Sequence, residues 1–161
     1  MDKKTISQNF VMGFEIAKKE YEFALSRFKE MDNKFNMLLV FAAGELTAFG
    51  ATFSTITDNI KFRLFYIIIF LPTLFIAILQ IFRGLFTKRI QLFDTFFMKC
   101  YKDFDVDGNN FIGRSIASYN ECIKSIEKVI KLKSKLFNTS LVFILFAFII
   151  FCTFMIINLF I

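Results

Sequence analysis

Three apolar stretches, each about as long as a bilayer is thick, constrain this 161-residue chain more than any other feature. They cover residues 36–57, 62–82 and 139–161, and a transmembrane helix needs about 20 predominantly apolar residues. The apolar share of 56% is also higher than soluble domains usually have. The sequence therefore predicts an all-α integral membrane protein with three transmembrane helices.

Amphipathic helical patterns lie outside these stretches. Residues 5–35 and 113–136 carry apolar side chains at steps of three and four, as helices of a bundle do. Residues 86–104 show the same spacing, and residues 105–112 are predicted as a loop. We expect one domain, residues 1–161, in which the three transmembrane helices extend into a cytosolic three-helix bundle. The predicted seams are Phe10, Phe14, Ala17, Tyr21, Ala24, Phe28, Met31 and Phe35, then Phe86, Ile90, Phe93, Phe97, Cys100 and Phe104, and finally Ile112, Ile116, Tyr119, Ile123, Ile126 and Ile130.

The first apolar stretch carries a carboxylate, Glu45, near its middle. Ionisable groups at membrane depth are costly and usually turn away from lipid, so Glu45 is a functional candidate. On a helical wheel, Glu45 shares one side with Thr52 and Thr55, beside small residues that permit close helix contact. Leu38, Leu39, Leu46, Phe49, Phe53 and Ile56 fall on the other side, which is predicted to face lipid. The small residues are Gly44, Thr47, Ala48 and Ala51.

Three roles for Glu45 remain open from the sequence. Copies of Glu45 from several chains can form a ring of carboxylates, as in cation-selective pores. Alternatively, a single neutral carboxyl can hydrogen-bond inside the bundle to Gln80, Asn158 or Thr153. A proton relay is the third role, although it needs a second titratable group in the spans. Pro72 interrupts the hydrogen bonding of the second span and is assigned to helix packing.

Basic residues set the predicted orientation. Of 20 Lys and Arg residues, seven precede Asn36, eleven follow Phe82, and the other two, Lys61 and Arg63, belong to the hairpin that joins the first two spans. Because cytoplasmic loops are enriched in Lys and Arg, we expect a cytoplasmic N-terminus and a C-terminus outside the cell. The predicted location is the inner (plasma) membrane, with the lipid bilayer as a partner.

Several functional classes find no support in the composition. The chain has no histidine, and its three cysteines match no zinc spacing. Residues 103–113 imitate the start of an EF-hand, but Arg114 stands where the closing glutamate belongs. The net charge of +6 comes without a nucleic-acid recognition motif. We therefore predict no enzyme activity, no metal, no cofactor and no direct nucleic-acid binding.

Two functions fit this architecture. The first is an oligomeric channel, pore or membrane-perturbing effector whose first span lines the path, because three such helices bury little surface alone. The second is a membrane-anchored helical module or scaffold that recruits a cytosolic protein. Exposed seam residues would then bind that protein, and the candidates are Tyr21, Phe28, Phe97, Tyr119 and Ile123.

In layout, the chain resembles small bacterial membrane effectors of anti-phage defence systems. The shared features are the basic amphipathic N-terminal helix, the short Thr57–Lys61 hairpin and the long helix after the second span. The resemblance implies a protein that perturbs the membrane when triggered. The third span departs from the usual two-span form, and holins have a similar layout. The resemblance assigns no functional residue.

Overall fold

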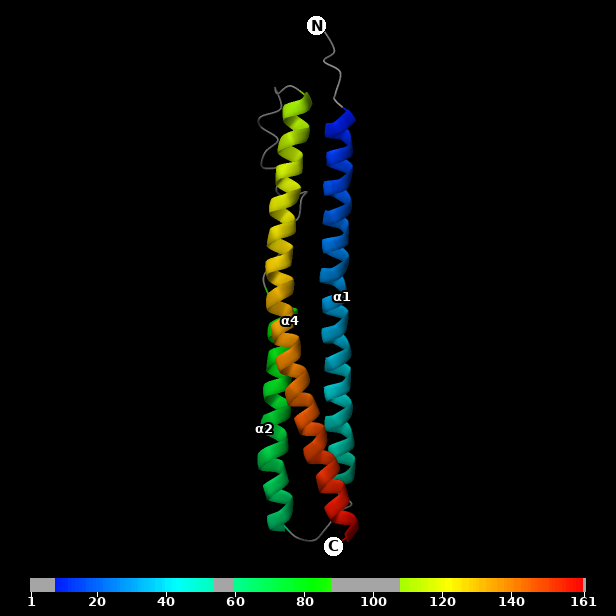
Figure 1. Cartoon of the computed structure of the whole chain (residues 1–161). Coiled ribbons are helices and arrows are strands. Elements are labelled where there is room, and N and C mark those ends of the chain that lie inside the picture. The colour runs from blue at the N-terminus through cyan, green and yellow to red at the C-terminus, as the bar shows by residue number, and fades with distance from the viewer. Residues whose placement is uncertain (1–7, 54–59, 88–107, 161) are drawn as a thin grey trace. The chain divides into compact units, whose positions relative to one another are not determined.

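The computed structural model describes residues 8–53, 60–87 and 108–160, and within these ranges it contains three α-helices and no strand (Figure 1). Helix α1 spans Gln8–Phe53, α2 spans Ile60–Leu85 and α4 spans Gly108–Phe160. Each has the length and apolar composition needed to cross a membrane, in the segments Val11–Thr52, Tyr66–Leu85 and Phe111–Ile157. For the described residues, this confirms the all-α prediction and the three helices able to span a membrane.

Helices α1 and α4 each join an amphipathic segment to an apolar one without a break. Helix α1 runs for 46 residues and α4 for 53. Glycine costs only about 1 kcal/mol in a helix interior, so Gly44 and Gly50 do not end α1. Helix α2 also continues through Pro72. The prediction that one helix can run from the first amphipathic segment into the first span is therefore confirmed.

The boundaries differ from the predictions in two places. Residues 105–112 were predicted as a loop, but α4 already begins at Gly108. Asn and Gly are common at helix starts as well as in turns, so their presence did not separate the two cases. Helix α2 extends beyond the predicted 62–82 to Leu85, and Phe86 and Thr87 follow in a turn. The rest of the predicted 86–104 helix, including Phe97 and Cys100, lies outside the described residues, as do residues 57–59 of the predicted Thr57–Lys61 hairpin.

The chain divides into two compact units. The first unit comprises the described residues of Met1–Glu30 and Lys88–Lys131, and the span unit comprises those of Met31–Thr87 and Leu132–Ile161. In the first unit, the Tyr119 ring of α4 lies 5.6 Å from the Phe14 ring and 5.4 Å from the Tyr21 ring of α1. Buried side chains complete this contact, namely Ala17, Ala24, Ser115, Cys122, Ile126 and Ile130.

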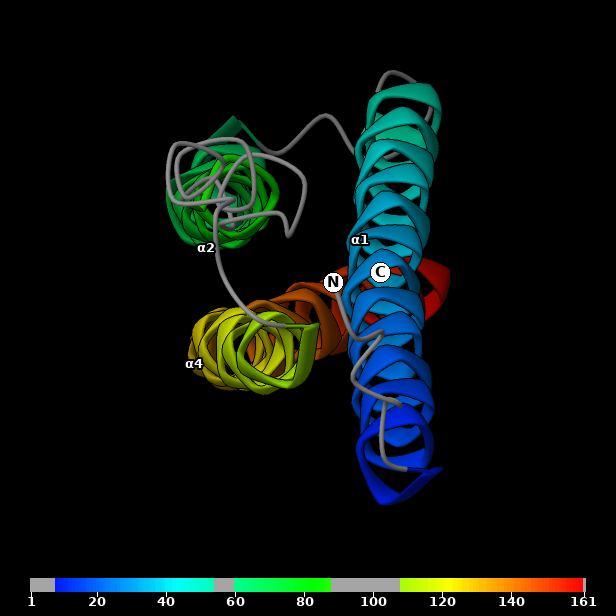
Figure 2. The ribbon, with the colours of Figure 1, turned by 90° about the horizontal axis from the view of Figure 1, so that it is seen from above.

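In the span unit, parts of all three helices lie side by side, as both views agree (Figures 1 and 2). Aromatic pairs join them: Phe49 of α1 stacks on Phe70 of α2 at 4.2 Å, and Phe154 of α4 lies 5.9 Å from Phe49. A Cβ added at Gly84 would collide with the ring of Phe35, so glycine permits this close approach of α1 and α2. The core of the unit is Phe35, Leu38, Ala42, Phe49, Phe70, Leu74, Ala77, Ile81, Ile144 and Ala147.

The inward positions of α1 keep one heptad pattern along the helix. They continue the predicted seam beyond Phe35 through Leu38, Ala42, Glu45 and Phe49 to Thr52, always at steps of three and four. This periodicity places Glu45 at a core position. It also corrects the wheel assignment, because Leu38 and Phe49 are buried beside Glu45 rather than facing outward. The prediction was wrong for these two residues because it placed the small residues of α1 at the centre of the inner face. Continuing the heptad pattern of residues 10–35 would have placed Leu38 and Phe49 inside.

Candidate intramembrane polar site

Glu45 lies in the interior of the span unit. Its side chain is 6% exposed, between the buried Ala42 and Phe49 on the same face of α1. Within residues 8–53, 60–87 and 108–160, neither carboxyl oxygen has a hydrogen-bond partner. Nearly all buried polar groups in proteins are hydrogen-bonded, so this carboxyl is an exception that asks for an explanation.

Aromatic contacts define what Glu45 faces. The contacts of Phe49 with Phe70, and of Phe35 with Gly84, fix an antiparallel register in which Glu45 is level with Leu74 of α2. The ring pairs Phe35–Phe137 and Phe49–Phe151 fix a parallel register in which Glu45 is level with Ala147 of α4. Leu74 and Ala147 are both fully buried. The residues of the other two helices that are level with Glu45 are thus apolar.

Gln80 carries a second buried acceptor. Its Oε1 atom has no hydrogen-bond partner within the described part of the chain. In the antiparallel register, Gln80 is level with Leu39, six residues or roughly 9 Å along the helix axis from Glu45. The Tyr66–Phe154 contact places Gln80 level with the buried Ser140, whose hydroxyl donates to the Leu136 carbonyl at 2.9 Å.

This geometry corrects the predicted hydrogen bonds of Glu45. Gln80 does not bond it, and Thr153 is exposed, with its hydroxyl donating to the Ile149 carbonyl at 2.8 Å. The side chain of Asn158 and all of Thr55 lie outside the described residues. Thr52 is half-buried, and its hydroxyl donates to the Ala48 carbonyl at 2.9 Å. For Gln80 and Thr153 the prediction was wrong, because spacing along one helix does not give the register between helices.

A buried ion pair, not anticipated from the sequence, stands at the Asp32 end of the span unit. The Lys133 ammonium of α4 donates to the Asp32 carboxylate of α1. Lys133 is only 1% exposed, whereas about a third of the Asp32 side chain is exposed. Lys133 occupies an inward heptad position, between Ile130 and Phe137. The signal was present in the sequence, because extending the α4 seam past Ile130 reaches Lys133 after three residues.

These groups form a series along the interior of the span unit, which we call the polar ladder. Its members are the Asp32–Lys133 pair, Gln80 with Ser140, then Glu45, and finally Thr52. Successive members are six or seven residues apart in α1 numbering, or roughly 9–11 Å. Apolar layers separate them, including Phe35 with Phe137 and Phe49 with Phe70. The ladder is therefore interrupted, and in this arrangement it forms no continuous polar path.

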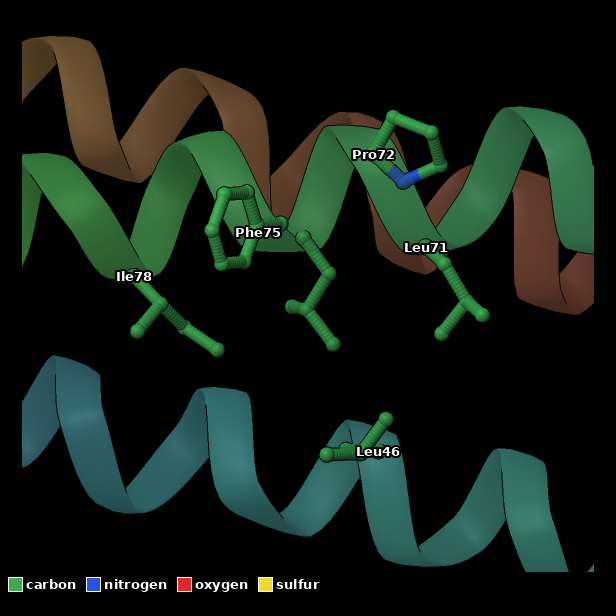
Figure 3. Close-up of a pocket in the computed structure, with 6 residues that line it drawn as sticks. Leu46, Leu71, Pro72, Phe75 and Ile78 are labelled. Atoms are coloured by element: carbon green, nitrogen blue, oxygen red, sulfur yellow. The ribbon is translucent and has the colours of Figure 1, made fainter.

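The predicted helix-packing residues lie on the outside of the span unit. Gly44, Ala48 and Ala51 are exposed, and the space around a Cβ at Gly44 is open to at least 4 Å. Pro72 lines an apolar groove of about 480 Å³ between α1 and α2, in which Leu46 of α1 faces Leu71 and Ile78 of α2 (Figure 3).

The predicted partner-binding residues have mixed surroundings. Tyr119 is buried against Phe14 and Tyr21 in the first unit. Tyr21, Phe28 and Ile123 are half-buried, and Phe97 lies outside the described residues. Larger exposed apolar side chains lie on the opposite face of α1, namely Met12, Ile16 and Phe23. Sequence periodicity predicted the inward seam of the bundle, but it did not identify the exposed face of Met12, Ile16 and Phe23.

Comparison of the chain with protein-family models, curated proteins and solved structures finds no match.

Proposed function

We propose that this protein is an oligomeric membrane protein that opens an ion path, with Glu45 as the group that ions meet inside the membrane. The observation that carries the proposal is the pair of Glu45 oxygens, buried in the span unit without a partner within the described residues. An unpartnered polar group in an apolar interior costs several kcal/mol, and a charged one costs more. Such groups in spans commonly mark ion or substrate pathways.

The described arrangement corresponds to a closed state. The stacked rings of Phe49 and Phe70 separate Glu45 from Thr52, and hydrophobic constrictions of this kind gate channels by excluding water. Opening therefore requires a movement of the helices, as in an effector that perturbs the membrane only when triggered. A ring of Glu45 carboxylates from several chains would additionally require α1 to rotate, since Glu45 lies inside its own chain in this state.

Assembly is proposed through the outer face of α1. Small residues let membrane helices approach closely, and Gly44, Ala48 and Ala51 are exposed on one face.

The positive-inside rule supports an inner-membrane location with the N-terminus in the cytoplasm and the C-terminus outside. The first unit would then lie in the cytosol.

The ion path can be tested by measuring ion flux through a variant in which a bulky ring of the apolar layer is replaced by a small side chain. Phe49→Ser removes the ring between Glu45 and Thr52, and we expect it to raise K⁺ flux from liposomes clearly above that of the wild type. Phe148→Ser is the matched control, because Phe148 is exposed on the outside of α4. A Phe49→Ser flux that equals the wild-type and Phe148→Ser fluxes would reject the ladder as an ion path.

The exposed apolar face of the first unit favours a second candidate, a scaffold that binds a soluble protein. Met12 and Phe23 are each about two-thirds exposed, and the guanidinium of Arg27 lies 5.9 Å from the centre of the Phe23 ring. A photo-crosslinker at position 23 that captures one defined protein, with liposome flux unaffected by Phe23→Ser, would support this function. Capture of nothing but other copies of the chain would reject it.

A further inference from the structure

The surroundings of Glu45 determine which ionisation state the closed arrangement can hold. Leu74 of α2 and Ala147 of α4 lie at the same height along the helix axes as Glu45. On α1 itself, Ala42 and Phe49 are the neighbouring inward residues. Thr73 of α2 lies near the same level, but its hydroxyl donates to the Ile69 carbonyl at 2.7 Å. Within the described residues, Glu45 therefore has no donor to stabilise a carboxylate.

The charged groups of the span unit are also distant. Lys34 is eleven residues away along α1, roughly 16 Å, and is exposed, as are Arg83 of α2 and Lys135 of α4 at the same end of the unit. The Asp32–Lys133 pair is thirteen residues away, roughly 20 Å, and its two charges compensate each other. Towards the other end, the titratable groups whose side chains the structure describes are the half-buried Cys152 of α4 and the buried Tyr66 of α2, neither of which supplies a positive charge. Gln80 contributes an amide, which is uncharged. An ionised Glu45 would thus be an isolated charge in an apolar interior, and such groups become neutral instead.

We infer that Glu45 is a proton-binding site in the closed state, where its buried and unpartnered carboxyl holds a proton that it releases only when water reaches it. The proton site itself follows from burial and from the absence of a hydrogen-bond donor or counter-charge beside Glu45 among the described side chains. Its coupling to opening rests on the proposed function, since helix separation is what would hydrate the carboxyl. The released proton leaves a carboxylate, which is the form that attracts cations in a pore.

A hydrophobic carbodiimide is a suitable probe of this site. Dicyclohexylcarbodiimide reacts with a protonated carboxyl: the carboxyl oxygen bonds to the central carbon of the reagent, and the proton moves to one of its nitrogens. The adduct rearranges to a stable acylurea without losing an atom, so the protein gains the mass of one reagent molecule. Labelling thus requires both an acid form and an apolar surrounding.

The experiment uses the full chain in liposomes at about pH 6, where a carboxyl in water is almost wholly ionised. We expect dicyclohexylcarbodiimide to label Glu45, and a water-soluble carbodiimide to label it several-fold less. Glu15, which is exposed on α1, is the internal control and should show the opposite preference. Peptide mass spectrometry locates the adducts. An unlabelled Glu45, or equal labelling by both reagents, would overturn the proton site.

Infrared spectroscopy provides a second reading that does not depend on reagent access. The wild type should show the carbonyl band of a protonated carboxyl, and Glu45→Gln should lose that band while keeping its helical amide signal. A wild-type spectrum without the band would also overturn the proton site. Neither measurement requires ion flux. Labelling with no flux in Phe49→Ser would therefore leave the proton site standing and reject only the ion path.

Discussion

At the scale of single residues, Gly84 shows how a missing side chain sets a helix contact. The ring of Phe35, fully buried and 5.8 Å from the ring of Phe137, lies where the Cβ of any other residue at position 84 would be. Overpacking a tight core costs about 1–3 kcal/mol. Gly84→Ala should lower the free energy of unfolding by this amount, measured by chemical denaturation in detergent micelles.

Gly44→Ala provides the matched control for this change. A Cβ at Gly44 meets open space, and alanine is the better helix former by about 1 kcal/mol. We expect this variant to be as stable as the wild type or more stable. If both alanine variants have the same stability, the close contact between Phe35 and Gly84 does not exist.

Cys122 gives a pH-dependent prediction. Burial in the first unit raises the pKa of its thiol, and the negative charge of Glu121 raises it further. Because the thiolate is the reactive form, alkylation of folded protein should need a higher pH than alkylation of denatured protein. The measurement uses a chain with Cys100→Ser and Cys152→Ser and follows iodoacetamide labelling against pH. Identical pH profiles in the folded and denatured protein would contradict the buried position of Cys122.

At the scale of elements, the Asp32–Lys133 pair tests the register of α1 against α4. Removing Asp32 leaves the buried Lys133 ammonium uncompensated, whereas removing Lys133 leaves a carboxylate that is about a third exposed and can be solvated by water. Asp32→Ala should therefore destabilise the protein by roughly 1–3 kcal/mol, at the lower end for buried pairs because Asp32 is partly exposed. Lys133→Met should lower the free energy of unfolding only slightly in the same measurement.

The double variant distinguishes a pair from two independent sites. With Lys133→Met present, Asp32→Ala should have almost no further effect, because no buried ammonium remains. Strictly additive losses in the double-mutant cycle would show that the two side chains do not interact.

The individual helices also show which features of the fold the sequence patterns could predict. Heptad spacing and apolar length predicted α1, α2 and the apolar part of α4, because periodicity is a property of one helix. They did not predict which residues face each other, as with Glu45 and Gln80, because register depends on the packing of separate helices. They also did not single out Lys133, although its heptad position three residues after Ile130 points inward. Composition alone favoured a loop where α4 begins at Gly108.

At the scale of the whole molecule, the outer face of α1 predicts assembly. Replacing the exposed Ala48 by a bulky residue should separate copies that meet through this face, since small residues are what permit close helix approach. The mass of the detergent-solubilised complex should fall from an oligomer in the wild type to a monomer in Ala48→Trp. Val142→Trp, on the exposed side of α4, is the control and should keep the wild-type mass. A monomeric wild type would end the oligomer proposal.

The most direct measurement of the central claim is the reversal potential across a planar bilayer under a salt gradient. The chain with Phe49→Ser should show a reversal potential close to that of a cation-selective path, because ions pass the Glu45 carboxylate in the hydrated state. Adding Glu45→Gln should move the reversal potential towards zero while current persists. A reversal potential unchanged by Glu45→Gln would show that ions do not pass Glu45.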